Sequence, residues 1–521
     1  MSKRLRGCTL TAIMSASLAG AVAAPAQAET LADALALAYE SNPNLLAQRA
    51  SQRALDETYV QARSGWRPTL NLNVVDTYQE SRTPRAGRGL SIDTNGDGVP
   101  DSVGAGIREN YLGSTSLSFS QPIWTGGRVA SAVTASQADI LAGRETLRRV
   151  ESQVMAAVIQ AYVDVRRDQD SVRIRAENVQ VLQRQVEESK ARFDVGEITR
   201  TDVAQSQSRL SAAQALYQSA VAQLGVSRAN YAATVGQNPG ELEPQPSLAY
   251  LLPSDIDSAF AVAEQNNPVL RSQQFAEQAS RARVSGARAE RMPTLSLRAT
   301  AAFSGPGRSI NTDLYSRNIQ GQAVLSVPLF NGGLTTSRIR QQIERNNVDR
   351  INIETQRRTV LQNLTQNWNQ LVATRANIIS TEEAVRAAEI AAEGTRQEQQ
   401  VGLRTTLEVL NAEQELRNDE LAAAAAKHDE YVAATGLLAT MGRLEARDLI
   451  PAVSQYDPKT NFRRLRITWG WVPWEEPISI VDHTLVVPPI HAVGGKPTEA
   501  AIPPGVVPPP AVTKTPGNRG R

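Results

Sequence analysis

The sequence predicts a mixed α and β membrane protein built from two internal structural repeats. Three observations predict this class: short motifs that recur in the same order in both halves of the chain, paired segments with strand-like alternation, and long proline-free segments with helical periodicity. Only 5% of the 521 residues are aromatic, which is low for a chain with a large globular core. We therefore expect the apolar residues to be spread along extended elements.

Composition excludes several classes of function. The formal net charge of +2 leaves no basic excess to offset phosphates, which argues against a nucleic-acid-binding protein. Cys8 is the one cysteine, so disulfides and thiolate zinc sites within the chain are excluded. The three histidines argue against a histidine-based metal or acid–base centre. No nucleophile–base arrangement or phosphate-binding loop stands out, so we expect no enzyme.

Residues 1–28 have the pattern of a secretory signal peptide. Basic residues at Lys3, Arg4 and Arg6 precede an apolar run and an Ala-Gln-Ala end at residues 26–28. Cys8 lies before the apolar run, so we expect it to be removed with this segment and expect no lipid anchor there. The chain that follows is predicted to be exported.

One unit of the chain is duplicated. Asn42-Pro43 recurs 225 residues later as Asn267-Pro268. A second motif, Pro-Ile-Trp-Thr-Gly-Gly at 122–127, recurs 206 residues later as Pro-Leu-Phe-Asn-Gly-Gly at 328–333. The first copy therefore carries 19 extra residues between residues 70 and 122. These offsets place the first structural repeat at 29–240, a linker at 241–252 and the second structural repeat at 253–450.

Each copy begins with a helical segment and continues into two strand-like segments. A helix is expected at roughly 30–64 in the first copy. Apolar residues then alternate in the first copy at 70–74 and 117–119, and in the second at 295–303 and 319–329. Such alternation is typical of transmembrane strands, and the alternative is a half-buried sheet in a soluble domain. No later segment reaches the ~20 apolar residues of a membrane helix, so entry into a membrane requires a β-barrel.

Long helices follow the strands. Proline is absent from 123–238 and from 329–450. A seven-residue apolar spacing, which imposes left-handed coiled-coil packing, runs through both segments. Its positions are Val158, Val165, Val172, Val179, Val186 and Phe193, and then Leu364, Leu371, Ile378, Val385, Ala392 and Gln399. A helix over 128–195 would be about 100 Å long, and a returning helix over 202–236 about half that. So thin a protomer must associate.

The strand count also requires association. One chain supplies four strands, whereas closed membrane barrels start at about eight. Two chains would give eight strands and three would give twelve. The sequence leaves this choice open, although twelve strands leave room for a lumen and eight are usually filled by side chains.

In its order of motifs the chain resembles the TolC family of outer-membrane channel-tunnels over residues 29–450. The motifs that carry the resemblance are the signal peptide, the two-fold repeat, the Asn-Pro pairs, the two Gly-Gly motifs and the helical turns at 195–197 and 401–403. The resemblance implies a trimeric 12-strand outer-membrane β-barrel, with four strands per chain, continued by a long periplasmic α-helical coiled-coil barrel. It also implies export of substrates received from an inner-membrane transporter through a periplasmic adaptor, and no catalysis.

The resemblance assigns roles to the two helical turns. The residues expected to contact the adaptor are Val195, Gly196, Glu197, Val401, Gly402 and Leu403. The gate at the periplasmic entrance is assigned to Arg404, Glu408 and Asn411, where Asn411 replaces the family's second acidic residue, and Gln399 replaces its usual aromatic partner. Three Glu408 carboxylates in one ring would repel anions and attract cations. The alternative is that Arg404 and Glu408 form an ordinary i,i+4 surface pair.

Two further sets of residues have expected roles. Where strand becomes helix, the prolines are expected to end the strand ladder, the glycines to permit the turn, and the aromatic residues to lie at the bilayer interface. These junction residues are Pro122, Trp124, Gly126 and Gly127, and Pro328, Phe330, Gly332 and Gly333. In the extra segment of the first copy, four oxygen ligands have the spacing of a calcium loop without its final glutamate: Asp93, Asn95, Asp97 and Asp101. The alternative is a turn-rich surface loop.

The C-terminal part has a different composition. Residues 451–486 form a Trp- and Pro-containing periplasmic extension that could pack against the helices, and the Pro-rich tail at 487–521 is predicted to be disordered. We expect location in the outer membrane with a large periplasmic portion and contact with outer-membrane lipid. The first expectation for function is the exit of a type I protein secretion system with an ABC-type transporter. The alternatives are small-molecule efflux with a proton-driven pump and a periplasmic coiled-coil scaffold.

Overall fold

The computed structural model describes residues 29–83, 106–307, 312–465 and 470–484. The predicted signal peptide at 1–28, the possible calcium ligands Asp93, Asn95, Asp97 and Asp101, and the Pro-rich tail lie outside the described residues, so those assignments stay predictions. The chain divides into two compact units. The first contains residues up to Gln61, Ser136–Ala279 and Asn347–Trp469, and the second contains Ala62–Ala135, Ser280–Asn346 and the residues from Gly470.

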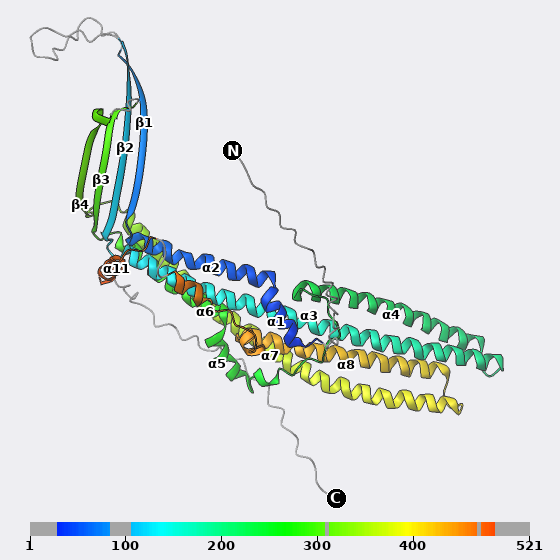
Figure 1. The fold of residues 1–521 in the computed structure, drawn as a ribbon. Coiled ribbons are helices and arrows are strands. Elements are labelled where there is room, and N and C mark those ends of the chain that lie inside the picture. Colours follow the sequence, from blue (N-terminus) through cyan, green and yellow to red (C-terminus); the bar gives the residue numbers. More distant parts are fainter. Residues whose placement is uncertain (1–28, 84–105, 308–311, 466–469, 485–521) are drawn as a thin grey trace, which may run out of the picture. The chain divides into compact units, whose positions relative to one another are not determined.

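The second unit contains a four-stranded antiparallel sheet in the order β1-β2-β3-β4 (Figure 1). The strands are β1 (Thr69–Thr83), β2 (Gly106–Trp124), β3 (Thr294–Pro306) and β4 (Ser316–Ser326). Thr69 pairs with Ser120, and Thr294 pairs with Ser326, so the start of β1 and the end of β4 lie at the same end of the sheet. In the described part of the chain, the outer edges of β1 and β4 have no partner strand.

Two expectations about the strand ends were wrong. Pro122 does not end the ladder, because β2 continues through it to Trp124 with a register shift between these two residues. This register shift allows the strand to continue although proline has no N–H group to donate to the ladder. Pro328 does not end β4 either, because that strand already stops at Ser326.

The expected single helix over 30–64 is two helices, α1 (Leu31–Ser41) and α2 (Pro43–Arg63). Proline has no N–H and disfavours helical backbone in the residue before it, so Asn42 is extended. The Asn42 side chain binds both sides of the break: its Oδ1 accepts from the Asn44 N–H at 3.0 Å, and its Nδ2 donates to the Thr234 carbonyl at 2.9 Å. The recurring Asn-Pro pair is therefore a helix break.

The same break recurs between α5 (Ile256–Asn266) and α6 (Pro268–Ala289). Asn267 Oδ1 accepts from the Val269 N–H at 2.9 Å, and its Nδ2 donates to the Thr440 carbonyl at 2.7 Å. Each Asn-Pro pair thus ties its helix break to the end of a returning helix. The sequence repeat at this motif corresponds to equivalent hydrogen bonds.

The long helices match in length between the two halves of the chain. The helices α3 (Arg128–Asp194) and α7 (Leu334–Gln400) have 67 residues each, and the returning helices α4 (Arg200–Val235) and α8 (Thr406–Met441) have 36 each. The returning helices end at Gly236 and Gly442, whose φ angles of 100° and 71° favour glycine. None of the helices in the described residues combines the length and the apolar character needed to cross a membrane.

The core of the first unit lies along the predicted seven-residue seam. Val158 and Val165 of α3 and Leu364 and Leu371 of α7 are buried. Tyr162 and Tyr231 lie within the same cluster, with ring centroids 6.4 Å apart. The seam does not stay buried to the tip, because Phe193 is exposed.

Short elements complete the two units. The 3-10 turns are η1 (Ser64–Trp66), η2 (Ala249–Leu251) and η3 (Thr312–Leu314), and the short helices are α9 (Ala446–Leu449), α10 (Lys459–Arg464) and α11 (Glu475–Thr484). Phe462 of α10 packs on Tyr59 with ring centroids 4.9 Å apart, and the Arg144 guanidinium lies 5.3 Å from the Phe462 ring centroid. The C-terminal segment therefore packs against α2 and α3 at α10.

Candidate functional site

The two helical hairpin turns have the same backbone geometry. Each ends in a glycine with positive φ, 80° at Gly196 and 79° at Gly402. The Glu197 N–H donates to the Arg192 carbonyl at 2.9 Å, and the Leu403 N–H donates to the Glu398 carbonyl at 2.9 Å. These are the hydrogen bonds that close a helix with a left-handed residue. A Cβ at either glycine would meet nothing within 4 Å, so the backbone angle alone requires glycine.

The turns present apolar side chains to solvent. Val195, Val401 and Leu403 are each at least 70% exposed, although they are large and aliphatic. Isolated exposed apolar residues are common, but these lie at the tips of both hairpins. The residues expected to contact an adaptor thus lie in an accessible position.

Capping boxes start both returning helices. Thr199 Oγ1 accepts from the Asp202 N–H at 3.4 Å, and the Asp202 carboxylate accepts from the Thr199 N–H at 3.0 Å. In the second hairpin Thr405 and Glu408 exchange the same bonds at 3.3 and 2.8 Å. The local pattern Thr-x-x-Glu is the signal that predicts this arrangement from sequence. Glu408 therefore has a structural role besides its proposed gate role.

Arg404 joins the two sides of the second turn. Its Nε lies 2.8 Å from Glu398 Oε2 at the end of α7, and its Nη1 lies 3.0 Å from Glu408 Oε1 at the start of α8. Hydrogen bonds from the Thr405 backbone, Arg404 and the Thr405 hydroxyl lower the pKa of Glu408. Hydrogen bonds to Glu398 and Glu408 raise the pKa of Arg404. All three groups are solvent-exposed, so the network fixes geometry more than it adds stability.

Asn411, the third predicted gate residue, faces a different partner. Its Oδ1 accepts from Arg209 Nη2 of α4 at 3.1 Å, and Arg209 also donates to Gln414. Arg209 was not predicted. Gln399 is buried, and its Nε2 donates to the Thr406 hydroxyl at 3.3 Å. Within one chain the structure thus brings Arg404 and Glu408 together and links Asn411 to the first hairpin.

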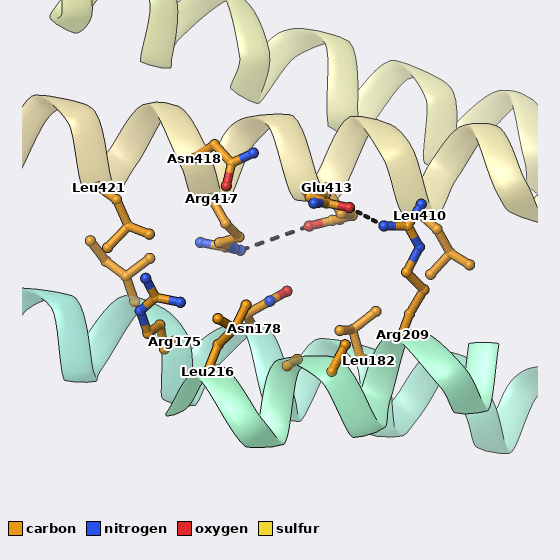
Figure 2. Close-up of a pocket in the computed structure, with 14 residues that line it drawn as sticks. Arg175, Asn178, Leu182, Arg209, Leu216, Leu410, Glu413, Arg417, Asn418 and Leu421 are labelled. Atoms are coloured by element: carbon orange, nitrogen blue, oxygen red, sulfur yellow. Dashed lines mark hydrogen bonds and ion pairs between the residues drawn. The ribbon is translucent and has the colours of Figure 1, made fainter. Parts of the chain in front are cut away.

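A charged groove lies between the two hairpins in the first unit. It has a cavity volume of about 90 Å³ and is lined by α3, α4 and α8. Figure 2 shows Arg175, Arg209 and Arg417 projecting into this gap. The buried Glu413 also lines the groove. Its Oε1 accepts from Arg396 Nη2, and its Oε2 lies 3.8 Å from Arg417 Nη2.

The buried charges of this groove were also missed from the sequence. Glu413 and Arg417 interrupt an apolar stripe formed by Leu410, Leu416 and Leu421. Charged residues on the apolar face of a helix are the signal that could have identified them. Among the described residues no group of three or more His, Cys, Asp or Glu side chains could hold a metal ion.

The first strand-to-helix junction, residues 122–127, is closed by a carboxylate from the C-terminal segment. The fully buried Asp482 accepts from the backbone N–H groups of Thr125, Gly127 and Ala130 at 2.9, 3.0 and 3.1 Å. Trp66 Nε1 donates to the same carboxylate at 3.1 Å. Asp482 therefore caps the first turn of α3 from more than 350 residues away.

These hydrogen bonds determine the ionisation of Asp482. Burial raises the pKa of its carboxyl group. The hydrogen bonds from Gly127, Trp66 and Thr125 together lower the pKa by more than burial raises it, so the pKa lies below the usual value. The positive end of the α3 dipole also favours the charged form. An ionised carboxylate is thus held at this buried position.

A second buried carboxylate holds α11 in place. Glu475 is fully buried, and its two oxygens accept from Arg63 Nε at 2.6 Å and Arg67 Nε at 2.9 Å. Glu476 is exposed and lies 2.9 Å from Arg63 Nη2. Trp474 Nε1 donates to Gln121 Oε1 at 3.0 Å. No local signal in the sequence pairs residues 475–482 with residues 63–130.

The second junction, residues 328–333, has the same turn without this cover. Gly332 and Gly333 have φ angles of 63° and 84°, compared with 68° and 85° at Gly126 and Gly127. Leu329 and Phe330, however, are 92% and 90% exposed. Trp124, the counterpart of Phe330, is half-buried. The glycines have positive φ angles at both junctions, whereas the surroundings differ.

Both the sequence and the fold of the chain are similar to those of outer-membrane efflux and channel proteins. A family model described as outer membrane efflux protein matches residues 34–237 and 260–443. The outer membrane efflux protein BepC of Brucella suis is 32% identical over 445 residues, which cover 85% of this chain and 92% of that protein. The alkaline protease secretion protein AprF of Pseudomonas aeruginosa is 27% identical over 344 residues, which cover 64% and 70%. The solved structure of the outer-membrane channel OprN superposes with a TM-score of 0.65 at 18% identity, covering 79% of this chain and 89% of that one.

Proposed function

The chain belongs to the outer membrane efflux protein family, and from this premise we propose that it is the outer-membrane exit duct of a tripartite export machine. Substrate passes from an inner-membrane transporter through a periplasmic adaptor into the duct and then to the exterior. The observation that carries the proposal is that, in both halves of the chain, two strands of the four-stranded sheet are followed within a few residues by a 67-residue helix. The duct has no catalytic role.

The working form is a homotrimer. One sheet has two outer edges without a partner strand in the described residues, and such edges are not stable in lipid. Pairing β4 of one chain with β1 of the next closes the sheet, and three copies give twelve strands. The exposed aliphatic side chains of the outer strands, such as Leu72, Val74 and Ile319, suit a lipid-facing surface.

The hairpin turns are the proposed contact with the adaptor. Their exposed Val195, Val401 and Leu403 can be buried on a partner, and the charged groove beside them adds polar specificity. The helix lengths, 67 and 36 residues in each half, support a duplicated unit with one equivalent turn in each copy.

Type I protein secretion is our first candidate for the route, with an ABC-type transporter as the inner-membrane partner. The similarity to a protein named for alkaline protease secretion supports it. Small-molecule efflux with a proton-driven pump is the second candidate, favoured by the higher identity to a protein named as an efflux protein.

A deletion strain tests the two candidates together. Mass spectrometry of the culture medium should find one or more exported proteins lost on deletion and restored by the gene, if type I secretion is the route. A fall in the minimal inhibitory concentration of drugs without loss of any exported protein would instead establish efflux. If the deletion strain shows neither a lost exported protein nor a lower minimal inhibitory concentration, the proposed export function is contradicted.

The gate at the turns is proposed to involve Arg404 and Glu408. In a trimer three Glu408 carboxylates form one acidic ring, which attracts cations. Replacing Glu408 with Gln removes this charge, yet Gln is also accepted at this position of a capping box, so the helix start is kept. We expect cation selectivity in planar-bilayer recordings to fall.

The matched control for the gate is Asp202→Asn, which changes the equivalent capping residue of the first hairpin. It should leave selectivity closer to the wild-type value. An unchanged reversal potential and conductance in Glu408→Gln would mean that Arg404 and Glu408 form only a surface pair.

A further inference from the structure

In the part of the chain that the structure describes, the second strand-to-helix junction is an exposed apolar surface. Leu329 and Phe330 are almost fully exposed, and Val327 and Leu334 beside them are about half exposed. Four large apolar side chains within eight residues cost free energy when they remain in water. The first junction has the same kind of residues but is covered by α11. Within one chain, α11 therefore covers the first junction and leaves the second exposed.

The topology of the sheet determines where this surface lies in an assembly. The ends of β2 and β4 lie at one end of the sheet, together with the starts of β1 and β3. If β4 of one chain pairs with β1 of the next, the end of β4 comes next to the start of β1, at a strand spacing of about 4.8 Å. The second junction of one chain is thus next to the β1 start of its neighbour.

The start of β1 is where α11 is held. Trp66, three residues before β1 begins, donates to Asp482, and Arg67 is paired with Glu475. The helix α11 contacts the turn before β1 and strand β2, and Asp482 also binds the start of α3. In a closed assembly α11 therefore lies beside the neighbouring chain's residues 327–334.

The solvent-facing side of α11 carries exposed apolar residues among polar ones. Its buried face consists of Glu475, Ile478 and Asp482, whereas Ile480 is 63% exposed, Val481 47% and the preceding Trp474 46%. An amphipathic helix normally turns polar residues to solvent. Exposed aromatic and aliphatic residues on a firmly anchored helix are typical of an interface.

We propose that α11 joins neighbouring chains: one face closes the first junction of its own chain, and Trp474, Ile480 and Val481 cover the second junction of the next copy. This inference rests on the proposed function, because it uses the closed assembly of identical chains. It accounts for one α11 serving two junctions per chain. It also assigns the C-terminal segment a role in assembly.

Inter-chain crosslinking tests the contact. The one cysteine, Cys8, lies in the predicted signal peptide, so single-cysteine chains can be made directly. Two differently tagged chains, Phe330→Cys and Ile480→Cys, are expressed together, and membranes are treated with a flexible bismaleimide. We expect a crosslinked dimer that carries both tags, at least fivefold more abundant than for the control pair Phe330→Cys and Val195→Cys. Native mass spectrometry measures the oligomeric state of the same samples.

The outcomes separate the inference from the proposed function. A doubly tagged dimer within a homotrimer supports the contact. A homotrimer without this dimer overturns the role of α11 and leaves the exit duct intact, and a crosslink from residue 480 to a different protein does the same. A monomer by native mass spectrometry overturns both.

A second variant tests the energetic role. Ile480→Ser with Val481→Ser leaves Glu475 and Asp482 in place, so the first junction should stay closed. We expect the trimer to dissociate at a lower detergent concentration, while hydrogen exchange at residues 125–130 stays unchanged. A trimer as resistant as the wild type would contradict the proposal.

Discussion

The two strand-to-helix junctions have matching backbones and different surroundings. In both, two glycines with φ near 65° and 85° redirect the chain from strand to helix. At the first junction Asp482 accepts hydrogen bonds from the buried start of α3, whereas at the second the Asn331 side chain donates to the Thr335 hydroxyl. The Gly-Gly pair thus specifies the turn locally, whereas α11, a segment distant in sequence, covers the first junction.

The largest effect is expected for Asp482→Ala. The change leaves three buried backbone N–H groups and the Trp66 indole N–H without their acceptor, and each such group costs about 1–3 kcal/mol. The free energy of unfolding should fall by roughly 5 kcal/mol. Hydrogen-exchange mass spectrometry should show faster exchange at residues 125–135. The control Asn331→Ala should change exchange at 331–341 only slightly, and equal effects would contradict the comparison.

A somewhat smaller effect is expected for Glu475→Ala. The fully buried carboxylate lies against Arg63 and Arg67, and removing one partner of a buried ion pair costs about 3–5 kcal/mol. Denaturant unfolding of the detergent-solubilised protein would measure this loss. The exposed neighbour provides the control, because Glu476→Ala should cost at most about 1 kcal/mol. Similar losses in the two variants would mean that burial of Glu475 is unimportant.

Gly126→Ala and Gly332→Ala compare the surroundings directly. Both residues have a φ near 65°, so alanine at either costs about 1–2 kcal/mol. A Cβ at Gly126 would also lie 2.6 Å from the Cβ of Met292, whereas one at Gly332 would meet nothing within 4 Å. Overpacking should add about 1–3 kcal/mol at Gly126 alone. Thermal unfolding of both variants measures the difference, and equal shifts would contradict the packing described for the first junction.

The smallest effect is a dependence on acid pH. Because the folded-state pKa of Asp482 is lowered, its stabilising contribution is present above its unfolded pKa, near 4, and is lost as the pH falls through the folded value. Wild-type protein should lose more unfolding free energy than Asp482→Asn between pH 6 and pH 3. Parallel losses in the two proteins would show that another acid is responsible.

Local patterns predicted much of the fold. The seven-residue spacing placed the long helices, and the paired alternation placed the strands, because both signals arise within one element. The recurring Asn-Pro pair was noted only as a marker of the repeat, although its side-chain and proline chemistry specifies a helix break. The expectation that Pro122 ends a strand was wrong. The strand accommodates the proline through a register shift between Pro122 and Trp124.

The candidate site was predicted less completely. The turn glycines follow from local backbone geometry, and Arg404 and Glu408 are close because they are four residues apart. Asn411 pairs with Arg209 on another hairpin, and Glu475 and Asp482 pair with residues more than 350 positions earlier. Such pairs depend on the packing of separate elements, which no short pattern encodes.

The distance along the chain between α3 and its cap has a consequence for folding order. Chains are synthesised and exported from the N-terminus, so the first turn of α3 emerges some 350 residues before the carboxylate that completes it. Contacts of such high sequence separation form late, because the intervening chain must first be ordered. Closure of the first junction thus becomes a final step of maturation, and a nascent chain that lacks residues 475–482 would be held in an immature, protease-sensitive state.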